Sequence, residues 1–479
     1  MFLAYKINKN NGRFVSDTAG PSGGLITLMS IFVKDRSFYK TLLAIALPIG
    51  LQNLITFAVS MADTVMLGAL GDVALSASSL ANQPTFIFSV LVFGIASGAC
   101  VLSAQYWGKK DLDRIQLIFG MGIKAALVFS ILVTLLAFLF PEQIMRIFTN
   151  EEPVIAAGTE YLSVICFTYF FLGITSILTS MLKSIEIVRI SVVVSCISVA
   201  VNVFFNWILI FGNLGAPAMG VRGAAIATLI ARITETAIVI VYMVFFEKKV
   251  NFQLKKMLPN DKELWKDFFK YGLPVVINEF MWSLGTSMQS IVIGRLGAAA
   301  VSANSITGVV QQLATIFIFG VAHASAVIIG KAIGEGDQSR AHAYAKTLQA
   351  FCVIMGIVGA CIVLITKGFA ISMFNVSEEA KALAQQLLII NAVLVFFVSY
   401  TAPTMVGILR GGGDIKFVMW LDILCLWAFT TPMGFLTGLV LKFPVWAVFA
   451  VMRLDEVIKS VIVFFRLRGT GWIRNVTRD

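Results

Sequence analysis

Long apolar stretches separated by short polar ones follow one another along the chain from about residue 42. Crossing the hydrocarbon core of a bilayer takes about 20 predominantly apolar residues in a helix, because every backbone polar group must then be hydrogen-bonded within the segment. We therefore predict twelve transmembrane helices, at 42–66, 76–106, 117–140, 157–182, 190–211, 219–246, 267–293, 299–330, 343–366, 382–409, 417–441 and 444–465.

The second half of the chain repeats the first with a shift of 226 residues, without gaps from about residue 35 to residue 171. Leu47-Pro48 matches Leu273-Pro274, for example, and Phe93-Gly94 matches Phe319-Gly320. Many transporters consist of two related halves that hold the substrate site between them. We expect a cytoplasmic tail at 1–34, a first half with six spans at 35–246, a cytoplasmic linker at 247–266, a second half with six spans at 267–466, and a C-terminal tail at 467–479.

Each half is preceded by a short segment, 35–40 or 261–266, that we predict to be an amphipathic helix on the inner membrane surface. Upstream, the apolar run from Gly24 to Val33 is too short to span a bilayer, and no small-residue cleavage site follows it. A cleaved secretory signal is therefore not expected.

Composition agrees with a membrane protein: 58% of the residues are hydrophobic, 13% are charged, and the mean hydropathy is +0.89. The formal net charge is +11, and most Lys and Arg residues fall in the loops on one side of the predicted spans. The positive-inside rule then places both termini in the cytoplasm, and the spread of charge over many loops argues against nucleic-acid binding. Six basic residues fall in loops on the other side: Arg146, Arg222, Arg295, Lys367, Lys381 and Lys442.

Several classes of chemistry lack the residues that they need. The six cysteines show no CxxC spacing, and the chain has only two histidines, so neither a disulfide framework nor a zinc site is expected. There is no HExxH or GxSxG motif, which argues against an enzyme. We expect no cofactor.

Polar residues inside the spans carry the functional information, because polar and charged groups are costly there. In the first span they recur every three to four residues and end in a carboxylate, and the seventh span carries a matching stripe. In the repeat, Asp63 aligns with Gln289, and Asn53 aligns with Glu279. The stripes are Gln52, Asn53, Thr56, Ser60 and Asp63, and Asn278, Glu279, Ser283, Thr286, Gln289 and Ser290.

The fifth span places Asn202 and Asn206 one turn apart on one face. Together with Asp63, their oxygens could hold a Na⁺ ion or a proton shared with the carboxylate. A ladder of hydrogen bonds between helices is an equally good interpretation. In the second half, Glu279 and Asp422 form a predicted acidic pair.

Two arginines inside spans are each followed by a glutamate at the third position. Arg232 and Glu235 lie in the sixth span, and Arg453 and Glu456 lie at matching positions in the twelfth. Such i,i+3 neighbours of opposite charge predict two structural ion pairs.

The order of motifs in both halves resembles the multidrug and toxic compound extrusion (MATE) transporters. The motifs are Leu47-Pro48 and Leu273-Pro274, Ala62-Asp63-Thr64 before Gly68 and Gly71, Gly108 with Asp111, Asn202 with Asn206 before Gly220 to Ala225, and Leu409-Arg410-Gly411-Gly412-Gly413-Asp414. The resemblance covers the chain from about residue 35. It implies a V-shaped pair of six-helix lobes that exports organic, often cationic, compounds in exchange for inward Na⁺ or H⁺.

By motif position, the resemblance makes Asp63 the cation-binding carboxylate, with Asn202, Asn206 and Thr228 as neighbours. Some relatives have an aspartate at the position of Asn206, and the glutamate that others use in the seventh span lies near Glu279. The coupling ion, and whether Na⁺ binds at Asp63 or at Glu279, therefore stay open.

We expect alternating access, in which a cation at a carboxylate biases the two lobes toward one opening. Small organic molecules would bind in a cleft lined by Gln52, Asn53, Trp282 and Gln289. The alternative function is a flippase for lipid-linked or polysaccharide substrates, for which several cations facing the cleft are expected. We expect a monomer in the plasma membrane, the inner membrane of a bacterium.

Overall fold

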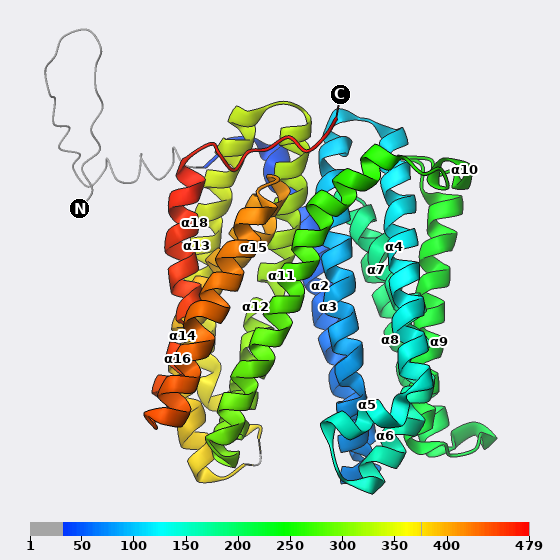
Figure 1. Ribbon diagram of the computed structural model, residues 1–479, viewed down its shortest axis with the longest axis vertical. Coiled ribbons are helices and arrows are strands. Elements are labelled where there is room, and N and C mark those ends of the chain that lie inside the picture. Colours follow the sequence, from blue (N-terminus) through cyan, green and yellow to red (C-terminus); the bar gives the residue numbers. More distant parts are fainter. Residues whose placement is uncertain (1–31, 375, 479) are drawn as a thin grey trace, which may run out of the picture.

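The computed structural model describes residues 32–374 and 376–478, so the predictions for residues 1–31 lie outside the described residues. Almost all of the described chain is helical, and Figure 1 shows two bundles of long helices side by side. The N-terminal lobe contains α2 (Arg36–Gly68), α3 (Asp72–Lys109), α4 (Leu112–Leu139), α5 (Pro141–Phe148), α6 (Glu152–Ile165), α7 (Thr168–Ser184), α8 (Arg189–Phe211), the 3₁₀ turn η1 (Asn213–Gly215), α9 (Gly220–Val241) and the π-helical turn η2 (Tyr242–Phe246).

The C-terminal lobe follows the short helix α10 (Leu254–Met257). Its long helices are α11 (Lys262–Arg295), α12 (Ala298–Gly334), α13 (Gln338–Ser372), α14 (Glu378–Ala402) and α18 (Leu454–Arg468). Shorter helices are α15 (Ile415–Ile423), α16 (Thr431–Phe435) and α17 (Val445–Val451), and π-helical turns are η3 (Pro403–Leu409), η4 (Leu424–Thr430) and η5 (Leu436–Val440).

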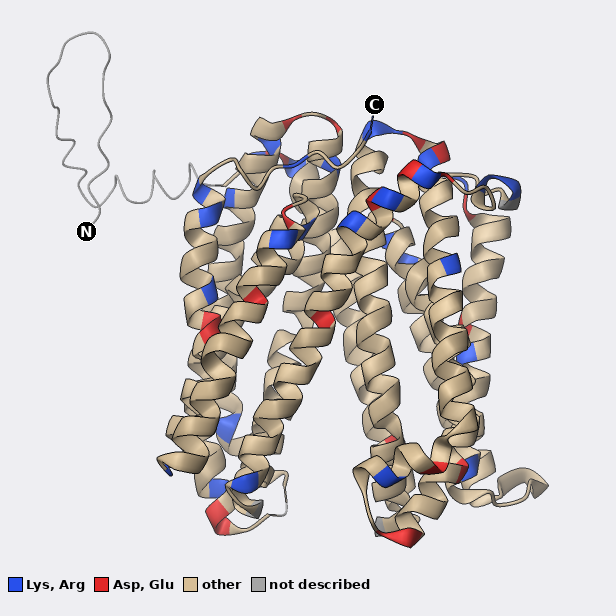
Figure 2. Cartoon of the chain, in the orientation of Figure 1, with Lys and Arg blue, Asp and Glu red and all other residues tan. Residues whose placement is uncertain are grey.

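These helices account for the twelve predicted spans. Within the described residues, nine helices are long and apolar enough to cross a membrane, and the bent pair α6 and α7 makes a tenth. The seventh span is α11, whose first turns are charged, and the twelfth is formed by α17 and α18 with a turn between them. Figure 2 shows that charged residues gather at the two ends of the bundles, with few between them.

The prediction of separate surface helices at 35–40 and 261–266 is wrong. Both segments are the first turns of long, unbroken helices, α2 and α11, whose N-caps are the side chains of Asp35 and Asp261. Phe38, Leu264 and Phe268 in these first turns are buried in the protein core.

The two lobes meet at one end of the molecule and separate at the other. At the end that carries the C-terminus, two large hydrophobic clusters contain residues of both lobes, since α2 packs along α12 and α11 packs along α3. At the opposite end each lobe has its own clusters. The result is the V shape that the family resemblance implied, open at the end far from the C-terminus (Figure 1).

Glycines allow the helices of the two lobes to touch. A Cβ atom on Gly98 of α3 would lie 2.4 Å from Cα of Gly272 in α11. Nearer the C-terminal end of the molecule, a Cβ on Gly108 would lie 2.9 Å from Cα of its repeat partner Gly334. Backbone therefore packs directly on backbone across the joined end.

Gly98→Ala is expected to lower the free energy of unfolding by about 1–3 kcal/mol, because the added methyl group has no space between α3 and α11. The midpoint of thermal unfolding in detergent measures this. Gly308→Ala is the matched control, since nothing lies within 4 Å of a Cβ built there in α12. Equal midpoints for the two variants would contradict this packing.

The C-terminal segment, residues 469–478, runs across the joined end from α18 toward α3 (Figure 1). Trp472 is completely buried, and its ring stacks against the ring of His342. The fully buried Gln105 of α3 donates hydrogen bonds of 3.2 Å to the carbonyl oxygens of Gly411 and Arg474, and it accepts one of 2.8 Å from the Val476 amide. The segment thus contacts both lobes.

Arg478 completes this contact. Its amide donates to the Tyr106 hydroxyl, and its carbonyl oxygen accepts from Arg114 of the N-terminal lobe at 2.8 Å. Its guanidinium pairs with Asp267 and, at 2.5 Å, with Glu263, both on α11. These carboxylates raise the pKa of Arg478 above its usual range. One residue therefore ties the two lobes together.

Arg478→Ala is expected to speed amide hydrogen exchange in residues 469–478 by roughly two- to fivefold, because partly exposed ion pairs contribute little to stability. Mass spectrometry of the C-terminal peptide measures the exchange. The control is Arg468→Ala, which removes the same charge from an arginine that lies over the Phe464 and Phe465 rings of its own helix, α18. Unchanged exchange in Arg478→Ala would show that the segment is held without this ion pair.

Candidate functional site

A hydrogen-bonded polar group joins three helices in the N-terminal lobe. The Asn206 amide of α8 donates to the Asp63 carboxylate of α2 at 2.6 Å and to the Asn202 carbonyl oxygen at 3.1 Å. Asn202 in turn donates to the Thr228 hydroxyl of α9 at 3.3 Å. The structure thus brings together the four residues that the sequence assigned to this lobe.

Asp63 has no ion-pair partner among the described residues, and one amide hydrogen bond leaves most of its oxygen lone pairs free. Nearby, the buried carbonyl oxygen of Asn206 has no hydrogen-bond partner in the described chain. A carboxylate and an unsatisfied amide oxygen are donors that suit a Na⁺ ion or a proton held by the carboxylate.

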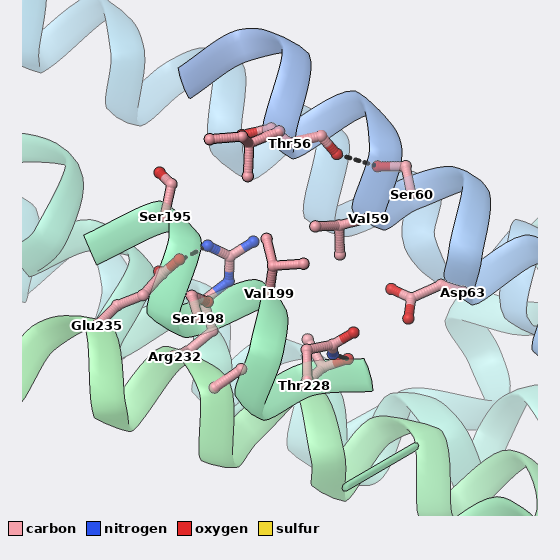
Figure 3. Close-up of a pocket in the computed structure, with 13 residues that line it drawn as sticks. Thr56, Val59, Ser60, Asp63, Ser195, Ser198, Val199, Thr228, Arg232 and Glu235 are labelled. Carbon is pink, nitrogen blue, oxygen red and sulfur yellow. Dashed lines mark hydrogen bonds and ion pairs between the residues drawn. The ribbon is translucent and has the colours of Figure 1, made fainter. Parts of the chain in front are cut away.

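Asp63 lines a cavity between α2, α8 and α9 (Figure 3). Arg232 and Glu235 line it as well and form the predicted ion pair, with 2.7 Å between the nitrogen and the oxygen. The hydroxyl groups of Ser195 and Ser198 make no hydrogen bond to a described residue, so they can bind water or an ion in the cavity. The remaining lining residues are Ile55, Thr56, Val59, Ser60, Val199, Asn202, Thr228 and Ala231.

In the C-terminal lobe, the two acids that we predicted as a pair have separate basic partners. Glu279 of α11 lies 2.8 Å from Arg410, which follows the π-helical turn η3; the Arg410 side chain is buried and that of Glu279 is 13% exposed. Asp422 of α15 lies 2.5 Å from Lys459 of α18. A carboxylate that is already paired with a buried cation is expected to bind a coupling ion more weakly than Asp63 does.

Lys459 also binds Asp455 of its own helix at 2.7 Å. The carboxylate of Glu456 accepts a hydrogen bond from the Thr401 hydroxyl and lies 3.9 Å from Lys459. The predicted ion pair of Arg453 with Glu456 is therefore wrong. Residues 452 and 453 form a turn between α17 and α18, so the i,i+3 spacing of an unbroken helix does not apply.

The four predicted cleft residues differ in environment. Trp282 on α11 is 40% exposed, whereas Asn53 donates to the Ile316 carbonyl oxygen at 3.4 Å, where α2 meets α12. Gln52 is half-buried, and Gln289 is buried and donates to the Met452 carbonyl oxygen at 3.0 Å. Trp282 is thus the most accessible of the four.

Sequence reasoning missed Arg410 as a site residue. It stands directly between an apolar run and three glycines, which predicts a loop. In the structure the chain stays helical through η3 and carries Arg410 into the lobe, where it is 2% exposed. The available signal was Lys183, a basic residue of the first half that likewise follows an apolar stretch ending in a leucine.

Known proteins resemble this chain over most of its length. Residues 48–208 and 274–436 match the family model MatE. A probable multidrug resistance protein NorM of Thermotoga maritima is 26% identical over 398 residues, which are 83% of this chain and 85% of that protein. An uncharacterized transporter, YisQ, of Bacillus subtilis is 24% identical over 444 residues, which are 92% of this chain and 96% of that protein.

The fold has matches among solved structures. The crystal structure of the eukaryotic MATE transporter AtDTX14 superposes with a TM-score of 0.81 at 18% identity, covering 91% of this chain and 96% of that one. The crystal structure of MATE in complex with MaL6 also has a TM-score of 0.81, at 17% identity, covering 90% of this chain and 95% of that one.

Long apolar helices in two related lobes, with buried polar groups inside each lobe, define a multi-pass membrane protein. The two segments that match the family model cover more than half of the chain and fall one in each half. The chain belongs to the MATE family, as its motifs indicated, and it is a transporter and not an enzyme.

Proposed function

We propose that this chain is a secondary active exporter of amphipathic organic compounds, many of them cationic, that exchanges them for Na⁺ or H⁺ by alternating access. The named NorM relatives are described as probable multidrug resistance proteins, which supports this substrate class. The exposed ring of Trp282 on α11 supplies an apolar, aromatic surface for such compounds.

The coupling ion binds in the N-terminal lobe, at Asp63. One observation carries this assignment: Asp63 faces a polar cavity and has no basic partner among the described residues, whereas Glu279 and Asp422 are each paired with a buried cation. A bound Na⁺ or proton neutralises Asp63, and this lowers the free energy of whichever arrangement of the lobes binds the ion better.

The protein acts in the plasma membrane, the inner membrane of a bacterium, with the joined end of the V in the cytoplasm. The excess of Lys and Arg in the loops at that end supports this orientation (Figure 2). One chain already contains both lobes and acts as a monomer, and it needs no cofactor besides the coupling ion.

The test is efflux of a fluorescent organic cation from proteoliposomes with Na⁺ and proton gradients imposed separately. We expect efflux to accelerate under one gradient, which identifies the coupling ion. Efflux that is indifferent to both gradients would overturn the antiporter and favour a channel or a flippase.

A further inference from the structure

A second polar cavity lies in the C-terminal lobe, bounded by α11, α12 and the turn after α17. Its charged lining residue is Arg453, and none of the lining residues is acidic. The uncharged lining residues are Thr286, Gln289, Ser290, Ile293, Asn304, Phe449 and Met452.

Arg453 has no acidic partner among residues 32–374 and 376–478. The glutamate that the sequence offered, Glu456, is bound by Thr401 and lies close to Lys459 instead. Arg453 lies over the Phe449 ring, whose centre is 5.9 Å from the guanidinium carbon. An arginine inside a membrane span is costly unless it faces water or a partner.

The corresponding residues of the N-terminal lobe have the opposite charge pattern. There Arg232 is neutralised by Glu235, and the free charge of the cavity is Asp63. In the repeat, Gln289 occupies the position of Asp63. Within the part of the chain that the structure describes, one lobe therefore presents a carboxylate without an ion-pair partner, and the other presents a guanidinium without one.

We propose that the cavity at Arg453 binds an anionic group, with a carboxylate as the best fit. The planar guanidinium can donate two parallel hydrogen bonds to a carboxylate. The Asn304 amide, which makes no hydrogen bond to a described residue, and the second N–H of Gln289 supply further donors at the same cavity. Phe449 and Met452 provide an apolar wall that strengthens such bonds.

This assignment deepens the proposed export function by naming a substrate class: amphipathic compounds that carry a carboxylate, alone or together with a cationic group. Only the identification of the ligand as an exported compound rests on that proposed function; the anion site itself does not. Binding at equilibrium, without any gradient, tests the site even if the chain proves not to be an antiporter.

The experiment compares 2-naphthoate with 2-naphthamide, which share a ring and differ in charge, by equilibrium dialysis against the full chain in phosphatidylcholine nanodiscs. Empty nanodiscs give the background. We expect naphthoate to bind about tenfold more tightly than naphthamide, because hydrogen bonds to an ionised group are about twice as strong as neutral ones.

Two variants remove the preference in different ways. Arg453→Met removes the guanidinium, and Gln289→Glu supplies the carboxylate that the N-terminal lobe has at this position. Both are expected to bring the ratio of the two affinities close to one, whereas Arg295→Gln, which removes an exposed charge at the end of α11, keeps it. Thermal unfolding midpoints near that of the wild type confirm that the variants are folded.

A ratio near one in the wild type, or a preference that survives in both Arg453→Met and Gln289→Glu, would overturn the proposal. Further arms distinguish the sources of the anion. If inorganic phosphate competes with naphthoate, the site takes soluble anions. If the preference disappears only in phosphatidylglycerol nanodiscs, a lipid headgroup occupies it.

Discussion

Asp63→Asn is expected to reduce gradient-driven efflux by roughly two orders of magnitude, to the rate seen without a gradient. The reason is that the coupling free energy between two ligands, here the coupling ion and the exported compound, is typically about 1–3 kcal/mol. The change removes the charge and keeps the shape of the side chain. The new amide can still accept the hydrogen bond from Asn206, so the lobe stays folded. Initial efflux rates from proteoliposomes measure the effect.

The matched control for this variant is Asp113→Asn. Asp113 lies in the first turn of α4, outside the spans, and pairs with Lys256. It loses the same charge in a solvent-exposed place and is expected to transport like the wild type. Efflux that still follows the gradient in Asp63→Asn would remove the N-terminal lobe from the coupling mechanism.

Glu279→Gln is expected to act on stability, with a loss of about 3–5 kcal/mol, because it leaves the Arg410 guanidinium buried without its counter-charge. Arg410 is only 2% exposed and one of its nitrogens already lacks a hydrogen-bond partner, so water cannot replace the carboxylate easily. The midpoint of chemical or thermal unfolding and the yield of folded protein measure the loss.

Restoring neutrality should reverse much of this effect. The double variant Glu279→Gln with Arg410→Met removes both charges, and it is expected to be more stable than Glu279→Gln alone. If Glu279→Gln unfolds at the wild-type midpoint but loses transport, Glu279 binds the coupling ion and the pair with Arg410 is dispensable for folding.

Periodicity made the N-terminal site predictable. Asp63 and the two asparagines lie on polar faces of long, regular helices, where spacing in sequence fixes direction in space. Thr228 came only from the family resemblance, since nothing in its own surroundings marks it. The twelve spans were equally accessible, because the bilayer demands long apolar helices.

Irregular backbone limited the rest. Arg410 follows a π-helical turn that continues a helix where glycines indicated a loop, and Arg453 sits in a turn that breaks the spacing on which its predicted ion pair depended. The pairing of Lys459 with Asp422 as well as with Asp455 of its own helix depends on how neighbouring helices pack. The C-terminal segment has no periodicity, and its burial depends on contacts with both lobes.

The orientation of the two sequence repeats limits how the proposed alternating access can produce an opening on the opposite side of the membrane. Six spans separate each residue from its repeat partner, so the two lobes point the same way through the membrane and are related by an axis along the membrane normal. Exchanging the conformations of the two lobes then leaves the opening on the same side, unlike in transporters with inverted repeats. The alternating access that we propose therefore requires a new arrangement for the opposite opening, in which the backbone contact of Gly98 with Gly272 and the bridge made by Arg478 are broken.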